Sequence, residues 1–228
     1  MKLLTHYHAL AELFEYPDGD YPRNVRKVID LLDGNYSVAV ADLERFLALL
    51  PAADIRAMQE LFTRTFDVQS ITTLDIGYVL FGDDYKRGEL LANLNREHKA
   101  VKNDCRRELA DHLPNLLRLL AKLSKSELTD ELTQEIIAPA LRNMIDEFTP
   151  ERIEKKHESY RKHYKTLIEP PANRHEVAVL YQFALRALYD VLKRDFEFTE
   201  RTLPQPGCDF LRTVARENEI EIKANSAY

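Results

Sequence analysis

Apolar residues recur at intervals of three and four along most of this 228-residue chain, which is the spacing of helices that bury one face. Proline and capping residues divide the pattern into pieces, and glycine, at 6 residues, is scarce. The predicted helices cover residues 5–16, 22–32, 37–50, 53–66, 89–108, 111–123, 130–148, 150–168, 175–196 and 208–222. The pattern predicts an all-α protein with roughly ten helices.

One multi-helix domain is expected to span residues 1–202. The remaining residues, 203–228, are predicted to form a linker, a short helix and a flexible C-terminal tail. Pro139 predicts a kink in its helix, and the segment 175–196 is apolar nearly all round, which is typical of a buried helix. On the helix predicted for 53–66, one apolar face is formed by Ile55, Met58, Leu61, Phe62 and Phe66.

The helix predicted for 111–123 begins with an unusual set of polar residues. Its apolar stripe consists of Leu113, Leu116, Leu117 and Leu120, and the opposite face, expected to meet water, carries Asn115, Arg118 and Lys122. Asp111 stands where an N-cap belongs, and Pro114 lies in the first turn, where proline loses no backbone hydrogen bond. Capping accounts for these two residues but leaves Glu108 and His112 without a structural reason.

Between residues 67 and 88 the helical pattern is interrupted by β-branched residues and by three of the six glycines. We expect a loop and a short apolar helix here, followed by a long helix that Asp83 or Asp84 caps. The sequence GDDYKRGE lacks the Gly-Lys-Ser/Thr of a phosphate-binding loop, and its aspartates would repel phosphate. Acidic residues beside a glycine-rich turn favour a basic peptide instead.

Composition narrows the classes of function. The chain is 45% apolar and 31% charged with a net charge of −6, which favours a folded protein with cationic partners and argues against binding to nucleic acid. Only Cys105 and Cys208 occur, without a Cys-x-x-Cys pair, which is typical of a reducing cytosol and of proteins without thiolate zinc. No leader or 18-residue apolar run is visible, so the sequence predicts a cytoplasmic protein without a membrane span.

Candidate catalytic groups are few. Glu154 and His157 have the Glu-x-x-His spacing of helical di-iron sites, but a second pair is lacking and lysines surround the first, which favours a solvated face. His98 and His163 stand among charged residues and are expected at the surface. There is no Gly-x-Ser-x-Gly elbow for nucleophilic catalysis. A helical metal-binding enzyme and a helical adaptor or regulator with an unrelated partner remain the alternatives to a peptide-binding protein.

Two segments together, 61–94 and 108–120, resemble the TorD/DmsD/NarJ family of molybdoenzyme assembly chaperones, most closely its nitrate reductase delta-subunit branch. The marker of the family is a Glu-x-Pro-Asp-His motif that opens a helix. Glu108, Asp111, His112 and Pro114 fit this region, while Ala110 replaces the usual proline. The delta-subunit branch also shows a Phe-Gly turn followed by Asp and Arg-Gly before a helix, which matches Phe81, Gly82, Asp83, Arg87 and Gly88 in order.

The resemblance implies a single helical domain of the TorD/DmsD type, cytoplasmic and without enzymatic activity. It implies a chaperone that binds the N-terminal segment, a twin-arginine signal or its remnant, of the apo catalytic subunit of a molybdopterin oxidoreductase. Such a protein holds no cofactor stably but assists insertion of the molybdenum cofactor into its client. The expected client-binding residues are Tyr78, Phe81, Gly82, Asp83, Arg87, Gly88, Glu108, Asp111, His112 and Pro114.

We expect these residues to form one wall for a basic, amphipathic segment. In this hypothesis Tyr78 and Phe81 supply apolar contacts, while Asp83, Glu108 and Asp111 pair with basic side chains. His112 bridges by hydrogen bonds. The hypothesis requires the loop 67–88 and the turn 108–114 to lie side by side.

Overall fold

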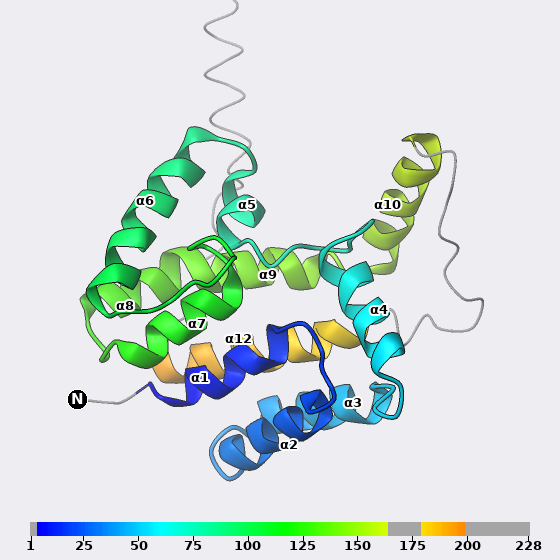
Figure 1. The fold of residues 1–228 in the computed structure, drawn as a ribbon, viewed down its shortest axis with the longest axis horizontal. Coiled ribbons are helices and arrows are strands. Elements are labelled where there is room, and N and C mark those ends of the chain that lie inside the picture. The colour runs from blue at the N-terminus through cyan, green and yellow to red at the C-terminus, as the bar shows by residue number, and fades with distance from the viewer. Residues whose placement is uncertain (1–3, 164–178, 199–228) are drawn as a thin grey trace, which may run out of the picture. The chain divides into compact units, whose positions relative to one another are not determined.

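The computed structural model describes residues 4–163 and 179–198, and every regular element in these ranges is helical. This confirms the predicted all-α fold (Figure 1). The elements are α1 (His6–Ala11), η1 (Glu12–Phe14), α2 (Tyr21–Leu32), α3 (Ser37–Leu49), α4 (Ile55–Phe66), α5 (Ile76–Phe81), α6 (Tyr85–Ala100), α7 (Leu113–Lys122), α8 (Glu127–Glu131), η2 (Leu132–Ile137), α9 (Ala138–Asp146), α10 (Pro150–His163) and α12 (Leu180–Phe196). The predicted boundary at residue 202, the linker and the tail helix lie outside the described residues.

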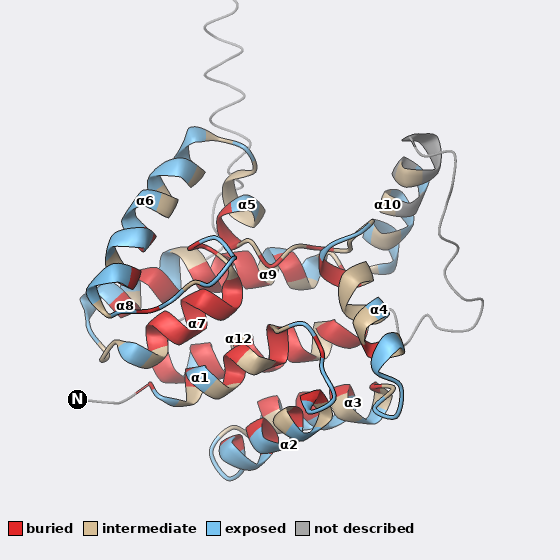
Figure 2. Cartoon of the chain, in the orientation of Figure 1, coloured by how far each residue is buried: buried red, intermediate tan, exposed pale blue. Residues whose placement is uncertain are grey.

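The core is built around α7 and α12. Helix α12 contacts α3 and α9, and α7 contacts α1, so elements from both ends of the described chain share one interior (Figure 1). Figure 2 shows that α7 is buried along nearly its whole length. Its leucine stripe is buried as predicted, but the prediction that Asn115 and Arg118 face water is wrong, because both side chains are buried. Only Lys122 of the three predicted polar positions is exposed.

Helix α4 begins at the N-cap Asp54, whose carboxylate accepts hydrogen bonds from the backbone N–H groups of Arg56 and Ala57. Of its predicted apolar face, Met58 and Phe66 are buried, whereas Ile55 in the first turn is exposed. The apolar face of α4 is therefore buried only beyond Ile55, and its aromatic rings point toward the interior.

Where the sequence predicts a kink at Pro139, the structure has a π-helical segment directly before the proline's helix. Residues Leu132–Ile137 form η2, and Pro139 lies in the first turn of α9 directly after it. Proline has no backbone N–H to donate, so the regular hydrogen-bond ladder cannot run unbroken through this position. Thr133 and Ile137 are both buried, so the widened turn belongs to the core.

Helix α6 ends at Ala100, earlier than the predicted residue 108. Lys102 and Arg106 adopt φ values of 51° and 56°, in the left-handed region that a helix cannot continue through. His98 is buried, so its expected surface position is wrong. Its Nε2–H donates to the carbonyl oxygen of Ala110 at 3.0 Å, and its Nδ1 accepts from Asn103 Nδ2 at 2.9 Å. Two buried hydrogen bonds thus bind the end of α6 to the irregular segment that leads into α7.

Candidate functional site

The two segments that sequence reasoning placed together do lie together. A β-bridge joins Asp75 to His112. The backbone N–H of Ile76 donates to the carbonyl oxygen of Asp111 at 3.0 Å, and that of Leu113 donates to Leu74 at 2.9 Å. The loop before α5 is therefore docked against the turn before α7. This juxtaposition is the geometry that the peptide-binding hypothesis requires.

An arginine from α6 ties this corner together. Arg87 Nε lies 3.0 Å from Asp111 Oδ2, and its terminal nitrogen lies 3.0 Å from Asp75 Oδ2. The guanidinium also lies over the ring of Tyr78, 5.4 Å from its centroid. Arg87 is therefore bound within the protein rather than directed at a partner. The pairing of a rigid guanidinium with two carboxylates fixes the spacing of the loop and the turn.

Asp111 does not take either role expected from the sequence. The N-cap of α7 is His112, one residue later. The Asp111 side chain is fully buried, and its Oδ2 accepts a second hydrogen bond from the backbone N–H of Gly77 at 3.2 Å. A Cβ at Gly77 would lie 2.7 Å from this oxygen, so only glycine permits the approach. Because Asp111 is buried and already paired with Arg87, it cannot meet an external arginine in this arrangement.

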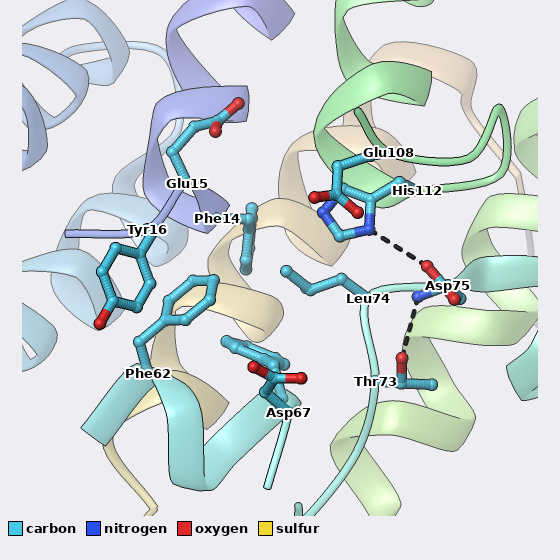
Figure 3. Close-up of a pocket in the computed structure, with 11 residues that line it drawn as sticks. Phe14, Glu15, Tyr16, Phe62, Asp67, Thr73, Leu74, Asp75, Glu108 and His112 are labelled. Atoms are coloured by element: carbon cyan, nitrogen blue, oxygen red, sulfur yellow. Dashed lines mark hydrogen bonds and ion pairs between the residues drawn. The ribbon is translucent and has the colours of Figure 1, made fainter. Parts of the chain in front are cut away.

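Asp75 and His112 extend the hydrogen-bond network of Arg87 and Asp111 toward the surface of the protein. His112 Nδ1–H donates to Asp75 Oδ1 at 3.2 Å, as drawn in Figure 3. The hydrogen bond from His112 and the nearby charge of Arg87 hold the pKa of Asp75 below its usual range, although partial burial acts in the opposite direction. Asp75 is therefore ionised at neutral pH and orients the imidazole ring.

A pocket of about 410 Å³ opens beside these two residues (Figure 3), within the size range of ligand sites. Four aromatic rings and four carboxylates dominate its lining. The lining residues are Phe14, Glu15, Tyr16, Phe62, Phe66, Asp67, Thr73, Leu74, Asp75, Glu108 and His112. They come from η1 and the residues after it, from the end of α4, from the loop before α5 and from the turn before α7. We call this cavity the aromatic–acidic pocket.

The carboxylates of the aromatic–acidic pocket differ in their partners. Glu15 pairs with the buried Arg118, and Asp75 pairs with Arg87. Among the residues that the structure describes, the side chains of Asp67 and Glu108 have neither an ion pair nor a hydrogen bond. No described side chain of the protein pairs with these two carboxylates, so the pocket favours a cationic ligand.

The polar residues of α7 shape this pocket from behind. Asn115 Nδ2 donates to the carbonyl oxygens of Leu109 at 2.9 Å and Cys105 at 3.3 Å, which holds the segment that carries Glu108. Arg118 donates to Asn115 Oδ1 at 3.2 Å and also binds Glu15. The signal for this network in the sequence was a pair of polar residues within a strongly apolar helix. Helical spacing alone predicts a solvent-facing side for these two residues.

Of the predicted client-binding residues, the structure places only Glu108 and His112 at the pocket. Pro114 is buried in the first turn of α7, and Tyr78, Phe81, Gly82, Asp83 and Gly88 lie outside the lining. Sequence reasoning missed the aromatic wall, because Phe62 and Phe66 read as core residues. The residues contributed by the N-terminal part, Phe14, Glu15 and Tyr16, were predicted only as the end of a helix over 5–16.

The alternative of a helical metal-binding enzyme finds no candidate metal site among the described residues. Among them, no group of three or more His, Cys, Asp or Glu side chains is placed to hold a metal ion. Glu154 on α10 is exposed, while the side chain of His157 lies outside the described part of the structure. In the same ranges, no helix combines the length and the apolar character that crossing a bilayer requires.

Comparison with known proteins supports the resemblance. The chain is similar to the nitrate reductase molybdenum cofactor assembly chaperone NarJ of Escherichia coli strain K12, with 29% identity over 138 residues, 58% of this chain and 57% of the relative. The protein of the same description from Escherichia coli O157:H7 has the same values. The chain thus spans between half and two thirds of the length of these curated relatives. No protein-family model matches the chain. The similarity confirms the predicted resemblance to the NarJ chaperones.

Proposed function

We propose that this protein is an assembly chaperone for a nitrate reductase-type molybdoenzyme and that it binds the basic N-terminal segment of the apo catalytic subunit. In this proposal it assists insertion of the molybdenum cofactor into the client without holding the cofactor itself, and it acts in the cytoplasm. The similarity to proteins described as molybdenum cofactor assembly chaperones supports a binding role over catalysis.

The observation that carries the proposal is the aromatic–acidic pocket beside the Glu108–His112 turn. An amphipathic segment with a twin-arginine signal or its remnant presents apolar and basic side chains in close succession. The accessible rings of Tyr16 and Phe62, backed by the buried rings of Phe14 and Phe66, offer an apolar surface for the apolar side chains. The carboxylates of Asp67 and Glu108, which have no partner within the described structure, attract the basic side chains. One small site thus matches both features of the client.

The wall beyond the pocket is proposed to extend the contact. Tyr78 is exposed on α5, and Asp83 is exposed in the turn that follows. A client segment of ordinary length is longer than the pocket, so its remainder passes over neighbouring surface. Arg87, Asp111 and Pro114 would then act by holding this wall in place, since all three are engaged inside the corner.

Calorimetric titration with the N-terminal 30 residues of the source organism's nitrate reductase-type catalytic subunit tests the proposal. Glu108→Gln and Asp67→Asn are each expected to weaken binding about tenfold, because each removes one charge-assisted contact worth about 1.4 kcal/mol. Glu44→Gln, at an exposed position of α3 outside the pocket, is the matched control and is expected to bind like the unaltered protein.

Affinity should also fall as salt is added, because the carboxylates and the basic segment attract each other through solvent-exposed charge. Equal affinity of Glu108→Gln, Asp67→Asn and the unaltered protein would contradict the proposed site. Failure of the unaltered protein to bind the segment, together with the absence of a molybdoenzyme subunit from co-purified material under nitrate respiration, would contradict the proposed function.

A further inference from the structure

We propose that the aromatic–acidic pocket selects arginine over lysine in the bound segment. The inference rests on the proposed function and deepens it, because it assigns one side-chain type to one cavity. The aromatic rings provide the selectivity, because carboxylates alone attract the side chains of arginine and lysine alike.

The rings of the pocket are set at steep angles to one another. Tyr16 and Phe62 have centroids 5.6 Å apart and an interplanar angle of 85°, and Phe62 and Phe66 have centroids 5.1 Å apart at 61°. Such edge-to-face pairs present a ring face next to a ring edge. Tyr16 is 56% exposed, so its ring lies at the rim, while Phe14 is fully buried. Tyr16 and Phe62, which is partly exposed, therefore form the accessible aromatic part of the lining (Figure 3).

This lining discriminates between the two basic side chains. A guanidinium is planar and weakly hydrated, so it stacks on a ring face and loses little on leaving water. An ammonium is a compact, strongly hydrated charge that loses more of its hydration among apolar rings. The guanidinium can also donate from several edges, and the carboxylates of Asp67 and Glu108 lie on different sides of the pocket (Figure 3).

The protein uses the same chemistry within its own corner. Arg87 lies between the carboxylates of Asp75 and Asp111 with its guanidinium over the Tyr78 ring. Arg118, which is also buried, joins Glu15 to Asn115. Two of the protein's own guanidinium groups therefore already occupy partly or fully buried sites beside this pocket, one of them against an aromatic ring.

The experiment compares three versions of the catalytic subunit's N-terminal segment, with its arginines retained, replaced by lysine, or replaced by neutral citrulline. Binding is measured by calorimetry at constant salt. We expect the lysine version to bind about tenfold more weakly than the arginine version, and the citrulline version more weakly still. Equal affinity of the arginine and lysine versions would overturn the inference while leaving the proposed function intact.

Matched tyrosine variants assign the selectivity to the pocket. Tyr16→Leu is expected to reduce the arginine-to-lysine ratio to about twofold while both versions still bind, because the rim ring is lost but the carboxylates remain. Tyr85→Leu, at a tyrosine 77% exposed on α6 and outside the pocket, should leave the ratio unchanged. A ratio that persists in Tyr16→Leu would overturn the inference. Absence of binding by all three versions to the unaltered protein would instead refute the proposed function.

Discussion

Asp111 and Asp195 are both fully or almost fully buried, and yet they serve the molecule in different ways. Asp195 on α12 lies 2.6 Å from His6 Nε2 and accepts hydrogen bonds from the hydroxyl groups of Tyr7 at 3.0 Å and Tyr36 at 2.8 Å. It therefore joins α1, the turn before α3 and α12. We call this group the Asp195 cluster. None of its members lines the aromatic–acidic pocket.

Asp111 has a less complete set of donors. Its Oδ2 accepts from Arg87 and Gly77, but within the described residues its Oδ1 accepts no hydrogen bond. The network continues through Arg87 to Asp75 and from there to His112 at the pocket. A buried carboxylate needs donors to offset its lost hydration. The comparison indicates that the Asp195 cluster stabilises the fold, whereas the corner around Asp111 also positions side chains of the aromatic–acidic pocket, the candidate site.

The largest expected effect comes from breaking the Asp195 cluster. Asp195→Ala should lower the free energy of unfolding by about 3 to 5 kcal/mol, because it leaves the buried Tyr7 hydroxyl and the partly buried Tyr36 and His6 without their acceptor. Urea denaturation measures the loss, with Glu44→Ala on the exposed face of α3 as the control. Affinity for the client segment should stay within about twofold, since no residue of the cluster touches the pocket. A loss of affinity with retained stability would reverse the assigned roles.

Breaking the other corner is expected to have a smaller effect on stability and a larger one on binding. Arg87→Met leaves Asp111 as an unpaired buried charge and should cost about 2 to 3 kcal/mol of unfolding free energy. It should also weaken client binding several-fold, because Asp75 and His112 lose their positioning.

Arg96→Met, at an exposed arginine of the same helix, controls for the loss of charge. The sharper test is a double-mutant cycle between Arg87→Met and His112→Ala on client affinity. The two changes should be less than additive if Arg87 acts through the His112 side of the pocket. Strict additivity would show that Arg87 and His112 act independently.

The smallest predicted effect concerns pH. Burial lowers the pKa of His98, so the folded state disfavours the protonated ring. The resulting stability is fully present above the unfolded-state pKa, about 6.5, and is lost as the pH falls through the folded-state pKa. Urea midpoints at pH 7.5 and 5.5 should therefore differ less in His98→Gln than in the unaltered protein. His8→Gln, at an exposed histidine of α1, should keep the full difference.

The sequence predicted those structural features that neighbouring residues determine, and it missed those that depend on contacts outside the helical pattern. The leucine stripe of α7 and the short helix α5 follow from neighbouring residues and were predicted. The N-cap of α6 is Asp84, one of the two residues, Asp83 and Asp84, that the sequence offered for this role. The burial of Arg118 was not predicted, because its partner Glu15 reaches it only through the tertiary fold. The burial of Asn115 was not predicted either, because the carbonyl oxygens of Leu109 and Cys105 reach it through the irregular path of the segment before α7, which helical spacing does not reveal.

The candidate site shows the same limit. The resemblance pointed to Glu108 and His112, which do line the pocket. The rings of Tyr16 and Phe62 lie far apart in the chain, and helical periodicity cannot tell a ring that lines a cavity from one that fills a core. Asp111 illustrates the reverse error. Its place before a helix suggested a cap, whereas Arg87 from another helix determines its use.

The single β-bridge between Asp75 and His112 makes the docking of the loop observable on its own. Two backbone amides, those of Ile76 and Leu113, donate to backbone carbonyl oxygens across the junction, and the backbone amide of Gly77 donates to the Asp111 carboxylate there. The amides of Ile76 and Leu113 both lie outside the repetitive hydrogen-bond ladder of any helix. Their deuterium exchange rates consequently report how often the loop lifts from the turn, separately from global unfolding. A bound client segment that contacts both the loop and the turn would slow the exchange of the Ile76 and Leu113 amide protons together.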